Sequence, residues 1–158
     1  MARVDLRGIF NRKGEDMALN AAEQVENICY LELLASSGNL LKNYFPGASI
    51  DFSPWREDPN TRLWYEDDSL DLAIQFPGWS PKLQCRSLLI QLRVLKDQSK
   101  ESPRLLGVIL RGVTFHGERW RLATIGDWKL TGSHLPQSSA MEQLQSLCRD
   151  LFALFPSD

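Results

Sequence analysis

The chain contains few of the side chains from which enzymes build reactive centres. Its 158 residues include two histidines and three cysteines. They contain no phosphate-binding loop, no paired-cysteine metal motif and no Gly-x-Ser-x-Gly nucleophile elbow. The sequence therefore predicts neither a resident cofactor nor a bound metal ion.

The cysteines are too few and too widely spaced for a disulfide framework. Three thiols cannot all pair within one chain, so we expect reduced cysteines, as in a cytoplasmic protein. Cys29 and Cys148 fall on predicted helices and are expected to be buried. Cys85 falls between two predicted strands, where exposure beside Arg86 is an alternative to burial.

Long hydrophobic runs and an excess of basic residues are also absent. No apolar run approaches the roughly 18 residues that span a membrane, and residues 1–7 lack the apolar core of a signal peptide. The 18 basic and 20 acidic residues give a net charge of −2, whereas nucleic-acid-binding domains usually carry a basic excess. We therefore expect a cytoplasmic protein that binds neither a membrane nor nucleic acid.

The composition is that of a globular protein, because 43% of the residues are apolar. A chain of this length can bury its own core without disulfides or a metal. Residues 1–15 have mixed charge and two glycines, which predicts a loosely docked N-terminal arm. Residues 16–158 are predicted to form a single domain.

The first helix is predicted to begin at Asp16 or Asn20. Asn20 with Glu23 resembles a capping box, and Gly38 suits the left-handed conformation that ends a helix. Its apolar residues recur at helical spacing, which predicts a buried stripe of Val25, Ile28, Cys29, Leu31 and Leu34.

The last helix has the most regular pattern in the chain. Ser139 and Glu142 form a second possible capping box, and Pro156 ends the helix. Its predicted buried stripe consists of Met141, Leu144, Leu147, Cys148, Leu151, Phe152 and Phe155.

The middle of the chain predicts strands. Apolar and polar residues alternate over 70–76 and 88–94, as in a sheet with one buried face, and a hairpin is predicted at His116–Gly117. Further strands are predicted over 105–115, 118–125, around 128–130, and near 48–53 and 61–66. No helix separates them, so we expect an α+β fold: an antiparallel β-sheet of about 5–7 strands with the N-terminal and C-terminal helices packed on one face.

Two stretches are candidate binding surfaces. The Trp55–Asp68 segment mixes aromatic and charged residues, as interface anchors do; its candidate anchors are Trp55, Arg56, Trp64 and Tyr65. In the alternative interpretation its tryptophans fold back onto the sheet. The second candidate is a basic patch on the predicted hairpin, where Arg119 and Arg121 would face together beside Arg111, unless nearby acids such as Glu118 pair with them.

A weaker pattern concerns Asp71 on one predicted strand and Gln91-Leu92-Arg93 on the next. This arrangement resembles the acidic residue and acid-x-Lys pair of restriction-endonuclease-type nucleases, over about thirty residues. The resemblance implies a metal-dependent nuclease or phosphodiesterase, with Glu26 of the first helix as a further carboxylate. Gln91 and Arg93 depart from the acid and lysine of that pattern, and the helix that normally follows is missing. The alternative is a polar outer face of the sheet.

These observations favour a non-catalytic binding, adaptor or assembly protein. We expect its partner to be another protein, with a homodimer through Trp55 or Trp64 as one form of that contact. A third alternative is an apolar-ligand carrier in which Trp79, Trp120 and Trp128 line a cavity between sheet and helices.

Overall fold

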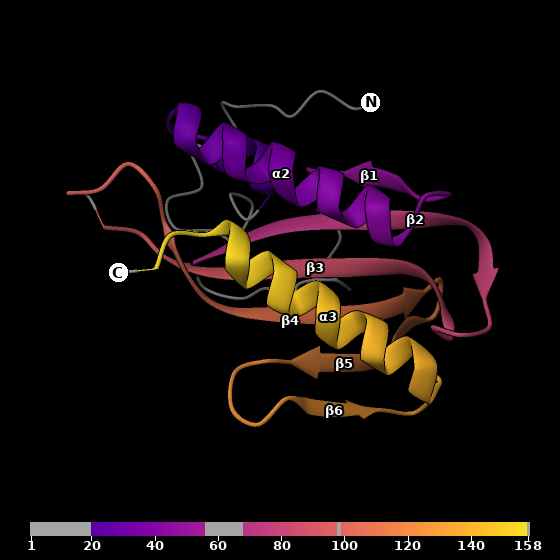
Figure 1. Cartoon of the computed structure of the whole chain (residues 1–158). Helices are drawn as coiled ribbons and strands as arrows, with labels where there is room; N and C mark the ends of the chain where they lie inside the picture. The colour runs from indigo at the N-terminus through magenta and orange to yellow at the C-terminus, as the bar shows by residue number, and fades with distance from the viewer. Residues whose placement is uncertain (1–19, 56–67, 98, 158) are drawn as a thin grey trace.

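The computed structural model describes residues 20–55, 68–97 and 99–157 (Figure 1). The predicted strand at 61–66 and the predicted arm at 1–15 lie outside these ranges. The elements follow in the order η2 (Ala21–Gln24), α2 (Ile28–Tyr44), β1 (Ser49–Asp51), β2 (Ser69–Ser80), β3 (Cys85–Leu95), β4 (Arg104–Thr114), β5 (Gly117–Ala123), β6 (Lys129–Gly132) and α3 (Ser138–Leu154).

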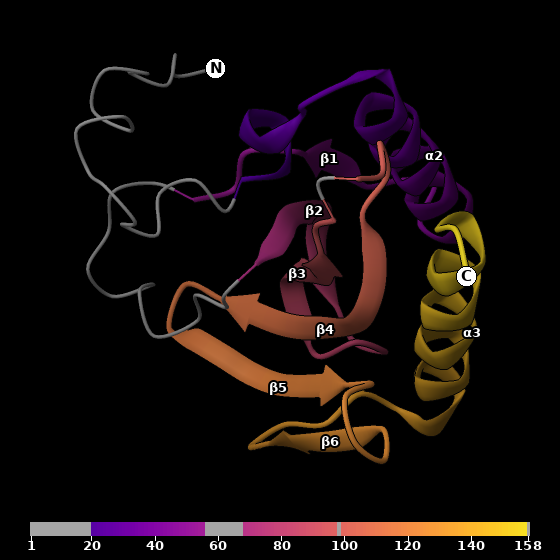
Figure 2. The same ribbon diagram turned by 90° about the vertical axis from the view of Figure 1, so that its left-hand side faces the viewer.

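Antiparallel pairing joins six strands of the described chain into one sheet. Each strand pairs with the next in sequence, in the order β1-β2-β3-β4-β5-β6. Both α-helices cover the same face of this sheet, as the turned view shows (Figure 2). The predicted α+β fold is therefore confirmed, including the hairpin at His116–Gly117 that joins β4 to β5. Neither helix in the described part of the chain is long and apolar enough to cross a bilayer.

The first α-helix begins later than the sequence pattern predicts. A short 3-10 helix, η2, follows Asn20, and α2 starts only at Ile28. Its N-cap is Asn27, whose side-chain Oδ1 accepts a hydrogen bond from the Tyr30 backbone N–H at 3.1 Å. The predicted capping box at Asn20 was wrong, because the Asn20 side chain makes no cap hydrogen bond to η2.

Gly38 does not end α2, contrary to the prediction. The helix runs on to Tyr44, and Ser37 Oγ donates within it to the Leu33 carbonyl at 2.8 Å. A Cβ atom on Gly38 would lie 2.9 Å from the Phe52 ring. Glycine is therefore present because the segment after β1 packs closely against the helix, and no turn is needed there.

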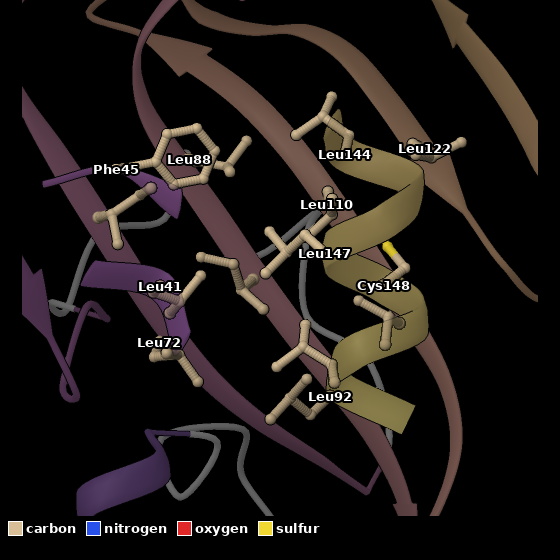
Figure 3. Packing of buried hydrophobic residues seen from close by; sticks show 14 of the residues in the cluster. Leu41, Phe45, Leu72, Leu88, Leu92, Leu110, Leu122, Leu144, Leu147 and Cys148 are labelled. Atoms are coloured by element: carbon tan, nitrogen blue, oxygen red, sulfur yellow. The ribbon is translucent and has the colours of Figure 1, made fainter. Parts of the chain in front are cut away.

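The stripe predicted for the last helix is correct. Leu144, Leu147, Cys148 and Leu151 are fully buried against the sheet, whereas Met141 and Phe152 are partly buried at its border. The capping prediction was wrong, because α3 starts at Ser138 after Gln137 and has no side-chain cap. Figure 3 shows how this stripe meets leucines of α2 and the central strands, among them Leu41, Leu72, Leu88, Leu92 and Leu110.

Trp120 occupies the core at the β4–β5 end of the sheet. It is fully buried, and its indole N–H donates to the Leu83 carbonyl at 2.5 Å. The indole lies directly over Gly112, its register partner on β4, where a Cβ atom would come within 2.3 Å of the ring nitrogen. A side chain at position 112 is therefore incompatible with this packing.

The second face of the sheet is not the solvated surface that the alternation predicts. On β2 all six residues from Ser69 to Ile74 are buried, so both faces of that strand are covered. Trp55 accounts for part of this burial, because it packs with Ala73 and Leu89 in a small second cluster. The polar side chains on this face are consequently held inside the protein.

We predict that Gly112→Ala lowers the free energy of unfolding by about 1–3 kcal/mol, because the added methyl group overpacks a buried site. Urea denaturation measures the change. Gly78→Ala is the matched control, since Gly78 also lies in a strand but a methyl group added there would have no atom within 4 Å. Equal stability of the two variants would contradict the proposed packing.

Candidate functional site

A row of buried polar side chains crosses the second face of the sheet. Asp71 on β2 and Gln91 on β3 are register partners, and both are fully buried. Arg111 on β4 is only 4% exposed. Buried polar groups destabilise the folded state unless they are hydrogen-bonded. The hydrogen bonds within this row therefore determine whether its side chains have a structural or a chemical role.

The Asp71 carboxylate accepts hydrogen bonds at both oxygens. Ser69 Oγ donates to Oδ1, whereas the Trp55 indole N–H and the Gln91 amide both donate to Oδ2, the latter at 3.2 Å. Donors therefore surround the carboxylate, which favours its charged form.

Gln91 links this carboxylate to the arginine of the next strand. Its Oε1 accepts from Arg111 Nε at 2.8 Å, while its amide nitrogen donates to Asp71. Arg111 Nη1 continues the row to Glu118 Oε1 on β5, at 2.7 Å. Arginine can only donate and a carboxylate can only accept, so the amide fits between them in one orientation.

Trp55 belongs to this buried row, which corrects its prediction as a surface anchor. Its side chain is 5% exposed. Asn20 also holds its backbone: Asn20 Oδ1 accepts from the Trp55 N–H at 2.8 Å, and Asn20 Nδ2 donates to the Trp55 carbonyl at 3.4 Å. The indole folds back onto the sheet, as in the alternative interpretation. The other predicted anchors, Arg56, Trp64 and Tyr65, lie outside the described residues.

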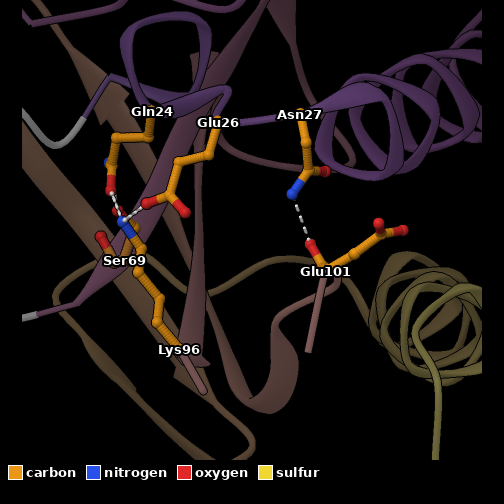
Figure 4. Close-up of polar contacts among 6 residues, drawn as sticks. All are labelled: Gln24, Glu26, Asn27, Ser69, Lys96 and Glu101. Carbon is orange, nitrogen blue, oxygen red and sulfur yellow. Dashed lines mark hydrogen bonds and ion pairs between the residues drawn. The ribbon is translucent and has the colours of Figure 1, made fainter. Parts of the chain in front are cut away.

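Of the nuclease-like residues, the structure brings Asp71 and Gln91 together but places Glu26 elsewhere. Glu26 lies in the link between η2 and α2, and it forms an ion pair with Lys96 at 3.5 Å (Figure 4). Lys96 also donates to Gln24 Oε1 at 3.1 Å. Arg93 is the register partner of Ser69, two residues along β3 from Gln91. The prediction that Glu26 lies on the first helix was wrong.

Burial raises the pKa of the Asp71 carboxyl to about 6. The hydrogen bonds that the group accepts and the charge of Arg111 act in the opposite direction. A proton on Oδ1 needs an acceptor, and the Ser69 hydroxyl can reverse to provide one. Trp55 and Gln91 can then keep donating to Oδ2, so the row accommodates both protonation states.

The arrangement leaves Asp71 few acceptor positions for a further ligand. Three hollows lined by described residues have volumes of about 370, 310 and 510 Å³, and neither Asp71, Gln91 nor Arg111 lines any of them. Within the described ranges, no three histidine, cysteine, aspartate or glutamate side chains lie close enough together to hold a metal ion. What the row does in this structure is tie four adjacent strands and Trp55 together.

The predicted arginine patch is divided by a bulge. Val113 pairs with Glu118 and Gly112 pairs with Trp120, so Arg119 is an extra residue in β5. Glu118 consequently reaches Arg111, the pairing considered as the alternative. Arg119 turns to the β2–β3 end, where its guanidinium lies 4.9 Å from the centre of the Trp79 ring. Arg121 remains the register partner of Arg111, and Arg119 does not face it.

The indoles do not line a common cavity. Trp120 fills the core, Trp79 lies against Arg119 and is 44% exposed, and Trp128 lies against Arg149 of α3. The geometry expected for an apolar-ligand carrier is therefore not present among these three side chains.

Of the three thiols, Cys148 is buried as predicted, whereas Cys29 is only partly buried. Cys85 is fully buried, and burial raises its pKa to about 12, so it is not an exposed thiolate. Cys29 is partly exposed, and its Sγ lies 3.4 Å from Glu101 Oε2. Asn27 binds the backbone carbonyl of the same Glu101 at 2.9 Å, which fixes the β3–β4 loop to the start of α2 (Figure 4).

The structure exposes three apolar side chains that the sequence pattern placed in the core. Val25, Ile28 and Leu31 are 36%, 62% and 51% exposed, and we call them the α2 entry patch. Ile28 and Leu31 are three residues apart on one side of the helix. The buried side instead carries Tyr30, Leu34, Ser37, Gly38 and Leu41. Leu34 is buried as predicted, but the rest of the buried side includes small and polar residues, so the apolar pattern alone did not identify it.

Comparison with known proteins assigns the chain to a family. Residues 22–157 match a family described as a domain of unknown function, and the chain belongs to that family. No curated protein and no solved structure matches the chain.

We predict that the stability difference between the wild-type protein and Asp71→Asn depends on pH. The pKa of Asp71 is higher in the folded state, about 6, than in the unfolded state, so the folded state binds more protons between the two values. The wild-type free energy of unfolding should fall relative to the variant by roughly 3 kcal/mol as the pH rises from about 4 to about 6. Chemical denaturation at several pH values measures this, with the exposed Asp127→Asn as a control for loss of one charge. A constant difference would contradict the buried environment of Asp71.

We also predict that Gln91→Glu lowers the free energy of unfolding by about 3 kcal/mol at neutral pH, because it sets a second carboxylate against Asp71. The loss should shrink in mild acid, where the pair can share a proton. Gln75→Glu is the matched control on the same face of β2: Gln75 is exposed, and its Oε1 accepts a hydrogen bond from Ser87 that a carboxylate preserves. Equal effects of the two substitutions would show that the row does not require a donor at position 91.

Proposed function

We propose that this chain is a non-catalytic binding or adaptor module that contacts another protein through the α2 entry patch. The observation that carries the proposal is the exposure of Val25, Ile28 and Leu31 within seven consecutive residues. Single exposed apolar side chains are common, but adjacent ones mark interaction surfaces more often. Apolar residues on one side of a helix are also a recurrent means of protein recognition.

Several polar contacts hold the start of α2 in place, and the α2 entry patch is therefore held in place as well. Asn27 caps the helix and binds the β3–β4 loop, and Lys96 holds the preceding link through Gln24 and Glu26. The opposite side of α2 is packed on the core. Exposed side chains on an element held at its first turn lose little conformational freedom on binding.

The buried row supports a structural role better than a catalytic one. The acceptor atoms of Asp71 are engaged by Ser69, Trp55 and Gln91. A metal-dependent nuclease would need these oxygens for the ion. Asp71 and Gln91 lie together as the nuclease interpretation requires, but their mutual hydrogen bonds favour a structural role.

Site-specific photo-crosslinking tests the proposal. A photoreactive phenylalanine analogue at position 28 or 31 of the full chain should form a crosslink to the same partner in native cells. The matched control carries the analogue at Phe115, which is 99% exposed at the β4–β5 turn. Ile28→Ser with Leu31→Ser should abolish partner binding while leaving the free energy of unfolding nearly unchanged, because both side chains face solvent.

The proposal would be overturned by two results. One is crosslinking at positions 28 and 31 that does not exceed crosslinking at position 115. The other is retention of the same partner by the double serine variant.

A further inference from the structure

The charges around the α2 entry patch indicate what kind of partner it fits. Glu32 is exposed on α2, four residues after Ile28, and therefore lies beside it on the helix surface. It makes no hydrogen bond or ion pair within the described ranges. Glu26 follows Val25 directly, and its side chain is 58% exposed. Two carboxylates thus flank the apolar side chains.

Basic residues nearby neutralise only part of this surface. Lys96 forms an ion pair with Glu26 and also donates to Gln24. Lys100 and Arg104 line a hollow beside Cys29, together with the acids Asp97 and Glu101. Lys42, further along α2, points its ammonium group at the Ala48 carbonyl, 2.6 Å away. The exposed residues of α2 between Glu32 and Lys42 carry no charge; they are Ala35, Ser36 and Asn39. Around the patch, the four acids Glu26, Glu32, Asp97 and Glu101 outnumber the three bases Lys96, Lys100 and Arg104, so its rim carries a small net negative charge.

We infer that the partner of the α2 entry patch is an amphipathic helix of another protein, whose apolar stripe is flanked by Lys or Arg. This inference rests on the proposed function. Complementary charges at the rim of an interface speed association and select the partner. Apolar residues at helical spacing fit the apolar stripe of a second helix.

The same charges disfavour a second copy of this chain as the partner. A two-fold symmetric contact buries the same patch on both subunits, so one acidic rim faces another acidic rim. Like charges brought together at an interface are unfavourable. This surface therefore favours a different protein as its partner; the homodimer considered from the sequence concerned Trp55 or Trp64 and is a separate prediction.

A pair of synthetic helical peptides tests the inference. The two peptides share one leucine stripe and differ only in its flanking residues, which are lysine in one and glutamate in the other. Titration into the ¹⁵N-labelled full chain should shift the amide resonances of residues 25–32. The lysine peptide should bind about tenfold more tightly than the glutamate peptide at low salt, and added salt should reduce the difference.

Charge reversal provides the matched control. Glu32→Lys should reduce the preference for the lysine peptide at least about threefold, whereas Glu142→Lys, at an exposed acid of α3, should leave it unchanged. Equal affinities of the two peptides, or shifts confined to other residues, would overturn the inference. If both peptides bind equally and both are lost with Ile28→Ser and Leu31→Ser, the apolar patch stands as a binding surface and only the basic partner is excluded.

Discussion

The orientation of one side-chain amide governs the second face of the sheet. Gln91 accepts from Arg111 and donates to Asp71, because arginine can only donate and an ionised carboxylate can only accept. Four strands and the Trp55 indole are joined through this arrangement. A buried arginine and a buried carboxylate are each expensive alone, and the neutral amide between them satisfies both while keeping the two charges apart.

The arrangement of the elements could be predicted from the sequence, because it depends on local patterns. Alternation along β2 and β3, the short join at His116–Gly117 and the stripe of α3 each reflect the burial of one face. Helix boundaries could not be predicted as well. At Gly38 the deciding factor is the Phe52 ring, which is distant in sequence, and local turn chemistry gives no sign of it.

The candidate site was harder to predict, for two physical reasons. Polar residues at alternate strand positions are predicted to face solvent, yet Trp55 packs over that face of the sheet. Nothing in the local sequence pattern indicates that a tryptophan outside the strands will cover them. One extra residue in β5 then exchanged the expected places of Glu118 and Arg119. On α2 the error was the reverse, because apolar residues predicted to be buried are exposed. The helix buries Ser37 and Gly38, whereas Ile28 and Leu31 face solvent.

The two outer strands of the described sheet are short, and this limits how the protein can associate. β1 has three residues and β6 has four, whereas the strands between them have seven to twelve. Near its start β2 meets Asn20 through an isolated bridge at Asp71. Short edge strands offer few unpaired backbone N–H and C=O groups to a strand of another molecule, which limits aggregation. The described sheet edges therefore offer less backbone for association than the exposed helix surface offers side chains.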